Sequence, residues 1–250
     1  MTHSAREIEQ ALALRETGFS TRVIADRLSI PRRTVNDWLR GRLPSGRTRR
    51  DLGCEGCGWD PHGFAELPPS YSYLLGLYLG DGCLSAHSRG VFRLRLTLDA
   101  TYPAIIREAA SSMRCVLPNS KVNTYLRPSH DVEVSSYSKS WPCLFPQHGP
   151  GKKHHRRIAL STWQEELVEE MPHLLLRGLI HSDGCRFMNT GRGGWSHPRY
   201  SFTNLSSGIR RIFMDACDLL ALHWTTSGNI VYVSRKADVA RMDAFIGPKA

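Results

Sequence analysis

A short apolar motif occurs twice in this chain, about a hundred residues apart. The first copy, residues 74–82, reads Leu-Leu-Gly-Leu-Tyr-Leu-Gly-Asp-Gly, and the second, residues 176–184, reads Leu-Arg-Gly-Leu-Ile-His-Ser-Asp-Gly. Each copy predicts a helix with a small residue at every fourth position, followed by Asp-Gly and a cysteine. Small residues at this spacing lie on one helix face and let two backbones approach closely. The repeat therefore predicts two helices of one chain that pack along these faces.

Both copies end in an acid followed by glycine. Gly82 and Gly184 suit the left-handed residue that ends a helix, so Asp81 and Asp183 would lie at two adjacent helix C-termini. Carboxylates are unfavourable there, because the helix dipole makes these ends negative and the two acids repel each other. A bound Mg²⁺ would remove the conflict, since it prefers oxygen ligands. The alternative, two unrelated buried helices with Asp-Gly turns, requires the motif to arise twice independently.

At these residues the sequence resembles the LAGLIDADG (DOD-type) homing endonuclease family, whose pattern L-x-G-L-x-x-[AGS]-D-G fits both copies. The acid at the sixth position of the family motif is replaced by Leu79 and His181, whereas the last acid is present in both copies. The resemblance covers residues 70–247 and implies an α+β fold, a pseudo-two-fold saddle of two αββαββ halves near residues 70–147 and 163–247. It also implies a monomer that acts as a pseudo-dimer and cuts double-stranded DNA.

The resemblance further assigns roles to individual residues. It implies that Asp81 and Asp183 are catalytic and bind Mg²⁺, helped by the main-chain carbonyls of Gly80 and Ser182. It also implies a basic residue beside the scissile phosphate, for which the candidates are Lys139 and Lys236. A solvated or phosphate-contacting role is the alternative for these two lysines. His181 can either tune the site or pack in the helix interface.

The segments between and after the motifs follow the same order in both halves. Residues 91–98 and 199–203 alternate between apolar and polar side chains, which predicts strands with one face on a core. A helix is expected at 103–116, strands near 121–127 and 131–137, a second helix around 209–220 and a last strand at 229–234. Residues 186–195 are expected to form a loop. A lysine follows the last strand of each half, and this internal repeat supports the two-fold arrangement.

Basic residues on these segments are candidates for DNA contact. In the resembled family such strands form a curved sheet along the major groove, and a surface strand without a ligand is the alternative. The candidates on the strands are Arg93, Arg95, Arg199 and Ser201. Residues 142–162 predict a joint rich in Pro, Gly and basic residues, which either contacts phosphates or is a solvated loop. The candidates in the joint are Lys152, Lys153, Arg156 and Arg157.

Residues 1–43 predict a separate all-α domain. Helices are expected near residues 4–17, 20–28 and 32–39, with Ser20 as a cap, Val23 and Ile24 facing inward, and a tight break at 29–31. This layout resembles the helix-turn-helix of recombinases and small regulators, through Ala25, Leu28, Ile30, Thr34, Val35 and Trp38. The resemblance implies that the last helix enters the major groove. The exposed candidates there are Arg32, Arg33, Thr34 and Asn36. A three-helix scaffold with a solvated basic face is the alternative.

Residues 44–69 predict a basic linker that contains Cys54 and Cys57, followed by His62. Cys-x₂-Cys is half of a structural zinc site, His62 is a candidate third ligand, and no fourth ligand is evident. The alternative is a pair of small turn cysteines.

The composition favours a polyanionic partner. The chain of 250 residues carries a net charge of +10, and nucleic acid is the usual partner of such an excess. No run of about 18 apolar residues occurs, so no membrane span is expected. Without an apolar N-terminal signal region, we expect a cytoplasmic, nucleoid-associated protein with reduced thiols.

Two functions are compatible with these features. The first is a Mg²⁺-dependent, site-specific DNA endonuclease with an added helix-turn-helix. The second is a non-catalytic transcriptional regulator, because LAGLIDADG domains joined to helix-turn-helix domains occur in bacterial sporulation regulators, where the catalytic acids are typically lost. Retention of both acids here favours cleavage, whereas the domain fusion favours regulation.

Overall fold

The structure, a computed structural model, describes residues 5–39, 67–191, 194–247 and 249. The chain divides into two compact units, residues 1–63 and 64–250, and each is considered by itself. The zinc candidates Cys54, Cys57 and His62 lie outside the described residues.

The first unit contains the three expected helices, α1 (Ala5–Glu16), α2 (Thr21–Leu28) and α3 (Arg32–Leu39). The Ser20 hydroxyl accepts a hydrogen bond from the Val23 amide at 3.4 Å, so Ser20 caps α2 as predicted. Ser29 ends α2 in the left-handed conformation. Val23 itself is 43% exposed, so the expectation that it faces inward is wrong. The small core consists of Ile8, Ala11, Ile24, Ala25, Ile30, Val35 and Trp38.

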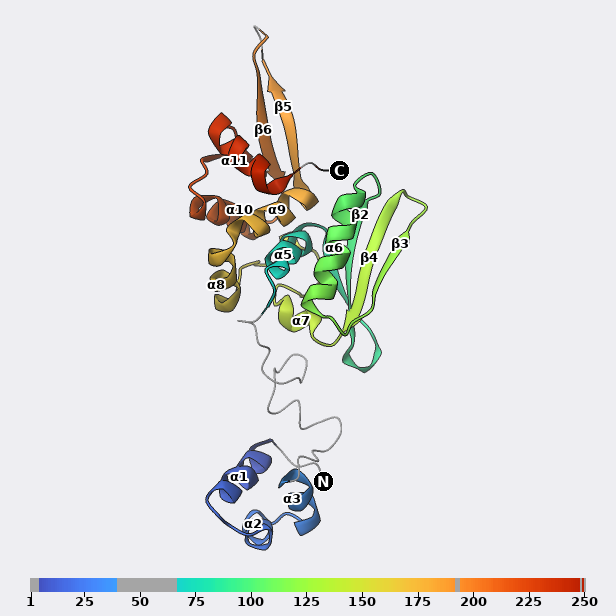
Figure 1. Cartoon of the computed structure of the whole chain (residues 1–250), viewed down its shortest axis with the longest axis vertical. Coiled ribbons are helices and arrows are strands. Elements are labelled where there is room, and N and C mark those ends of the chain that lie inside the picture. The colour runs from blue at the N-terminus through green and yellow to red at the C-terminus, as the bar shows by residue number, and fades with distance from the viewer. Residues whose placement is uncertain (1–4, 40–66, 192–193, 248, 250) are drawn as a thin grey trace. The chain divides into compact units, whose positions relative to one another are not determined.

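The second unit repeats one order of elements (Figure 1). The first half comprises α5 (Ser70–Asp81), β1 (Gly82–Ala86), β2 (Phe92–Asp99), α6 (Pro103–Val116), β3 (Val122–Leu126), β4 (Asp131–Ser138) and α7 (Trp141–Leu144). The second half comprises α9 (Pro172–Asp183), β5 (Gly184–Thr190), β6 (Ser196–Thr203), α10 (Ser207–Leu219), β7 (Trp224–Ser227), β8 (Ile230–Val233) and α11 (Lys236–Ile246). The short helix η3 (Lys153–His155) and α8 (Thr162–Glu170) lie between the halves in sequence.

Each half has a four-stranded antiparallel sheet with the same connectivity. The strand orders are β1-β2-β4-β3 and β5-β6-β8-β7. In β2 the alternating residues Leu94, Leu96 and Leu98 are buried, which leaves the arginines between them on the other face. The observed topology confirms the predicted α+β fold of two αββαββ halves.

The motif helices α5 and α9 pack with their backbones in contact. A Cβ placed on Gly76 would lie 2.5 Å from the Leu175 carbonyl oxygen and 2.8 Å from the Gly178 Cα. A Cβ on Gly178 would lie 2.2 Å from the Tyr73 carbonyl oxygen. Real Cβ atoms do not approach so closely, so both positions require glycine. The predicted close approach of the two motif helices is therefore confirmed.

The glycines that follow the two acids have a different role from the expected one. Gly82 has φ −83° and Gly184 has φ −104°, so both are extended rather than left-handed. Each glycine leaves its helix directly into a strand. A Cβ on Gly82 would lie 2.5 Å from the Tyr78 Cα, and one on Gly184 would lie 2.5 Å from the Ile180 Cα. Glycine is required here because the strand turns sharply past the last helical turn.

Several elements differ from the sequence-based expectation. Residues 186–190 belong to β5 rather than to a loop, and β5 with β6 forms a long hairpin that projects beyond the rest of its sheet (Figure 1). Helices α8 and α11 were not expected from the sequence. Helix α8 begins at the last residue of the expected joint, and α11 follows the last strand. Helix α5 begins at Ser70, and Pro69 occupies its cap position.

Candidate functional site

Asp81 and Asp183 end the two motif helices. They are brought close together because the backbones of these helices touch along a seam at Gly76 and Gly178. Gly80 lies against the end of α9: a Cβ on Gly80 would lie 2.5 Å from the Ser182 Cβ and 3.1 Å from the Asp183 Oδ2. Both acids are half-buried. The structure thus places the two acids and the preceding small residues at one level, as the repeated motif predicts.

Both carboxyl groups have raised pKa values. Burial raises the pKa of Asp81 to about 7, with a further contribution from the negative charge of Asp183. Burial also raises the pKa of Asp183, and this is opposed by a hydrogen bond of 2.6 Å from the Asn204 amide to Asp183 Oδ2. Lys153 and Lys249 lower both pKa values through their positive charge. Negative charge on the pair is therefore unfavourable, and the two lysines and the Asn204 hydrogen bond relieve it in part.

Two lysines lie at the C-terminal ends of the motif helices. The Lys153 ammonium donates to the carbonyls of Leu79 at 3.0 Å and Gly80 at 3.2 Å, and also to that of Tyr78. It lies 4.7 Å from the centre of the Tyr78 ring. Burial lowers the pKa of Lys153 to about 8, and the two acids oppose this shift. These contacts place a cation on the negative end of the α5 dipole, which is the favourable location for it.

Lys249 has the corresponding position at the end of α9. Its ammonium donates to the Gly184 carbonyl at 2.9 Å and the Ile180 carbonyl at 3.4 Å, and lies 5.4 Å from the centre of the Tyr102 ring. Burial lowers the pKa of Lys249, and Asp81 provides the largest opposing effect. The two lysines therefore follow the pseudo-two-fold relation of the halves, although they come from unrelated segments.

Each acid lines a cavity together with one of these lysines. A cavity of about 910 Å³ is lined by Asp183, Lys153 and Asn204, among others. A smaller cavity of about 360 Å³ is lined by Asp81, Lys249 and Thr97, among others. Lys153 thus binds carbonyls of α5 and shares a cavity with Asp183 of α9. Lys249 binds carbonyls at the end of α9 and shares a cavity with Asp81 of α5.

The lysines proposed to lie beside the scissile phosphate do not line the cavities of the two acids. Lys139 and Lys236 are exposed, and neither lines the two cavities. Lys139 follows Ser138, which pairs with Phe92, whereas the acid end of the sheet begins where Gly82 pairs with Leu96. Four residues of strand separate these positions, roughly 13 Å. The sequence indicates Lys153 only as one of four basic residues of the joint that are candidates for phosphate contact. It contains no motif that points to Lys249.

The strand residues expected to contact DNA lie on the sheet faces opposite the core. Arg93 pairs with Glu133 and donates to the Ser135 hydroxyl at 3.2 Å, while Arg95 lies 3.9 Å from the Glu133 carboxylate. Arg199 lies 5.0 Å from the centre of the Tyr232 ring. Ser201 pairs in register with the same tyrosine. These faces therefore carry arginine, hydroxyl and aromatic groups.

The basic cluster of the joint is divided between different environments. Lys152 and Arg157 are exposed, whereas Lys153 reaches into the site. Arg156 turns toward its own loop and donates to the carbonyls of Gln147 at 2.9 Å, Pro150 at 3.2 Å and Gly151 at 2.8 Å. Arg156 therefore closes the loop that presents Lys153.

The four candidates of the helix-turn-helix lie on α3. Arg32 and Arg33 are exposed, and Thr34 and Asn36 are half-buried. Val35 and Trp38 on the same helix are buried in the core of the unit. The start of α3 thus presents two guanidinium groups to solvent.

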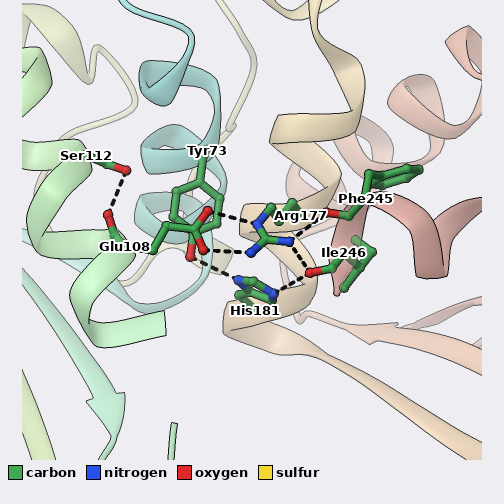
Figure 2. A network of polar contacts seen from close by, with 7 residues as sticks. All are labelled: Tyr73, Glu108, Ser112, Arg177, His181, Phe245 and Ile246. Carbon is green, nitrogen blue, oxygen red and sulfur yellow. Dashed lines mark hydrogen bonds and ion pairs between the residues drawn. The ribbon is translucent and has the colours of Figure 1, made fainter. Parts of the chain in front are cut away.

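His181 is packed in the interface between the motif helices. It makes a hydrogen bond of 3.0 Å between its Nδ1 and the Tyr73 hydroxyl and one of 3.1 Å between its Nε2 and the Ile246 carbonyl (Figure 2). The carbonyl requires Nε2 to be the donor, so Nδ1 accepts from the tyrosine. Burial lowers the pKa of His181 to about 4, which keeps the ring neutral. The packing interpretation of this histidine is confirmed.

The donor atoms around the two acids fit a hard cation. No cluster of three or more His, Cys, Asp or Glu side chains occurs in the described part of the chain. Two carboxylates with raised pKa values and the main-chain carbonyl of Gly80 nevertheless form an all-oxygen donor set, which suits Mg²⁺.

Among the described residues, none of the helices is long and apolar enough to cross a membrane.

One family model matches the N-terminal part of the chain. Residues 2–42 match the family model of the homeodomain-like domain. No curated protein matches the sequence significantly.

The structural neighbours are LAGLIDADG proteins. A structure of mesophilic variants of the homing endonuclease I-DmoI has 13% sequence identity and a TM-score of 0.48, and the match covers 72% of this chain and 96% of that one. I-DmoI in complex with DNA and Mn has 13% identity and a TM-score of 0.49, with 72% and 97% covered. Full-length DUF199/WhiA from Thermatoga maritima has 17% identity and a TM-score of 0.45, with 74% and 58% covered.

Proposed function

We propose that this chain is a Mg²⁺-dependent, site-specific DNA endonuclease that carries an additional helix-turn-helix DNA-binding unit. The observation that carries the proposal is that Asp81 and Asp183 end two helices whose backbones touch at Gly76 and Gly178, close enough for the charge of Asp183 to raise the pKa of Asp81. Burying two like charges together is costly. A protein that retains such a pair at two adjacent helix C-termini has a functional reason to do so, and a divalent cation is the simplest one.

The residues that would hold Mg²⁺ are the carboxylates of Asp81 and Asp183 and the main-chain carbonyls of Gly80 and Ser182. A bound Mg²⁺ would supply a more acidic water and would neutralise charge on the phosphate. The Asn204 amide holds the Asp183 carboxylate by a hydrogen bond of 2.6 Å and so fixes its orientation. The pKa of Asp81 is about 7 without a cation, so binding of Mg²⁺ near neutral pH would be accompanied by release of a proton from the pair.

Lys153 and Lys249 are our candidates for the cations beside the two scissile phosphates, in place of Lys139 and Lys236. Each ammonium lines a cavity with one acid, and charge that develops on a phosphate is stabilised by a preorganised cation. Because each cavity combines one motif acid with one of these two lysines, the pseudo-two-fold arrangement fits the cutting of both DNA strands by a monomer.

DNA binding rests on several surfaces. The net charge of +10 favours attraction to a polyanion, and the outer faces of both sheets carry Arg93, Arg95 and Arg199. Lys152 and Arg157 are exposed on either side of η3, whose Lys153 lines the larger cavity. In the first unit, Arg32 and Arg33 of α3 are exposed. Arginine and serine side chains can contact both phosphates and base edges. With DNA as its partner, we expect the protein at the nucleoid in the cytoplasm.

A non-catalytic transcriptional regulator is the second candidate, and one observation favours it. The Lys153 and Lys249 ammonium groups already bind the carbonyls at the ends of α5 and α9. They also offset the charge of the two acids. An acid pair that is neutralised by two lysines does not need a metal for stability. In this alternative the acids and lysines form a structural ion cluster, and the homeodomain-like unit provides the sequence recognition.

A cleavage assay separates the two functions. Purified wild type and the Asp81→Asn/Asp183→Asn variant are incubated with a randomised duplex library in Mg²⁺ or in Ca²⁺. We expect Mg²⁺-dependent double-strand cuts at a recurring sequence with wild type and none with the variant. Equal enrichment of one bound sequence by both proteins, without cuts in Mg²⁺, would establish the regulator instead.

A further inference from the structure

A polar cluster in the second unit has no role in the proposed chemistry. Arg177 on α9 binds the Glu108 carboxylate of α6 through two hydrogen bonds of 2.9 Å and 2.8 Å (Figure 2). Its Nη1 donates to the Phe245 carbonyl at 2.7 Å and also to the Ile246 carbonyl. Tyr73 of α5 lies against the same group, with the guanidinium 5.9 Å from its ring centre. This cluster joins both halves of the unit.

The cluster fixes the last turn of α11. The final carbonyls of a helix have no partners within the helix. Arg177 and His181 supply partners here, because Arg177 binds the carbonyls of Phe245 and Ile246 and His181 binds that of Ile246. Gly247 then ends α11 with a positive φ of 70°, and a Cβ on it would lie 3.3 Å from the Arg177 Nη1. The end of α11 is thus held on α9.

The position of this helix end determines where Lys249 lies. Lys249 comes two residues after Gly247, and its ammonium binds the Gly184 carbonyl at 2.9 Å. It lines the cavity of Asp81. A displacement of the last turn of α11 would therefore move Lys249 away from that cavity.

Lys153 is positioned by different contacts. Arg156 closes its loop through the carbonyls of Gln147, Pro150 and Gly151, none of which belongs to the Arg177 cluster. The two lysines are thus held by two separate arginines. A change in one arginine is expected to affect one lysine and its cavity, not both.

We infer that Arg177, together with Glu108, is a positioning residue that places Lys249 beside Asp81 and thereby controls cleavage of one of the two DNA strands. The placement of Lys249 follows from the contacts alone, whereas the strand assignment rests on the proposed endonuclease function. Arg156 has the equivalent role for Lys153 and the other strand.

Lysine footprinting tests the placement without any need for catalysis. The full-length protein is acylated with an N-hydroxysuccinimide ester, and the modification rate of each lysine is measured by mass spectrometry, with exposed Lys139 and Lys236 as references. In wild type, Lys249 should react more slowly than the references. In Arg177→Gln and in Glu108→Gln the acylation rate of Lys249 should rise about tenfold, because the last turn of α11 can then open locally and free the Lys249 ammonium. The rate of Lys153 should stay unchanged.

Two further variants make the footprint decisive. Arg156→Gln should accelerate Lys153 and leave Lys249 unchanged. Arg241→Gln is the control, since Arg241 of α11 also binds two main-chain carbonyls, but those of Leu220 and Ala221 just after α10 rather than those at the end of α11. Glu108→Gln keeps the arginine and so tests the inference even where Arg177→Gln fails to fold. Unchanged protection of Lys249 in a folded Arg177→Gln or Glu108→Gln protein would overturn the inference.

Strand-resolved cleavage tests the functional part. With a duplex labelled differently on each strand, Arg177→Gln should slow the cutting of one strand about 10- to 100-fold, as expected for a misplaced group, and Lys249→Met should slow the same strand. Arg156→Gln should slow the opposite strand. Equal slowing of both strands by Arg177→Gln would indicate a general loss of structure and contradict the strand assignment. Absence of cleavage by wild type would reject the endonuclease function, and the footprint would still decide the placement of Lys249.

Discussion

Replacement of Gly178 by alanine tests the seam on which the site depends. A Cβ at this position would lie 2.2 Å from the Tyr73 carbonyl oxygen, 2.9 Å from the Gly76 Cα and 3.0 Å from the Leu77 nitrogen. All three are backbone atoms, so no side-chain rotation can relieve the overlap. An ordinary contact begins near 3.4 Å, so α5 and α9 would have to separate by about 1 Å.

Two opposing effects determine the stability of Gly178→Ala. Alanine improves helix propensity by about 0.5–1 kcal/mol. Overpacking in a dense interface costs about 1–3 kcal/mol, and the separated helices also lose dispersion contacts along the seam. We therefore expect a net decrease of about 2 kcal/mol in the free energy of unfolding. A shift of about 1 Å between the acids should also reduce the cleavage rate about 100-fold.

The measurement is urea unfolding of the full chain by circular dichroism, with hydrogen exchange over α5 and α9 to locate the change. Gly149→Ala is the control, because its nearest neighbour would be the Arg156 side chain at 3.5 Å, an ordinary contact. This control should change stability by less than about 0.5 kcal/mol. A Gly178→Ala protein as stable as wild type, or more stable, would leave only the gain in helix propensity and would refute the backbone contact.

Two further predictions concern the charged groups of the site. Burial and Asp183 raise the pKa of Asp81 from 3.8 to about 7, so its contribution to stability is present below the unfolded value and is lost as the pH rises through about 7. In urea melts with EDTA, the stability of Asp81→Asn relative to wild type should therefore increase as the pH rises from about 4 to about 7 and stay constant above that; an identical difference between the two proteins at pH 4 and pH 8 would contradict this assignment. Lys153→Met should slow cleavage of one strand at least about 100-fold, because a preorganised cation is lost from the cavity of Asp183. Its DNA affinity in Ca²⁺, measured by fluorescence anisotropy, should stay near that of wild type, and a parallel loss of affinity would show that Lys153 is a binding residue only.

The fold could be predicted to a large extent from local patterns. The repeated motif predicted α5 and α9, and the alternation of Leu94, Leu96 and Leu98 predicted β2. Local patterns failed where an element has no periodic signal of its own. Strand β5 lies in a segment with glycine and arginine and pairs with β6, so its structure depends on a partner rather than on its own residues.

The residues of the site divide in the same way. Asp81 and Asp183 could be identified from sequence, because each stands at the end of its own motif helix and the helix period fixes the small residues on one face. The sequence also determined the charge of +10, the half-buried arginines on the outer faces of the strands and the exposed arginines of α3. These properties depend on residues that are neighbours within one element.

Only the tertiary structure decided which cations accompany the acids. Lys139 and Lys236 followed from their sequence position after the last strand of each half, yet the strand register carries Lys139 toward the far end of the sheet. Lys153 reaches the site from the short helix η3 and Lys249 from the segment after α11, and Arg156 and Arg177 fix them by binding main-chain carbonyls. Main-chain carbonyls are identical at every position in the sequence. Which of them meets a given arginine or lysine is therefore set only when the chain is folded.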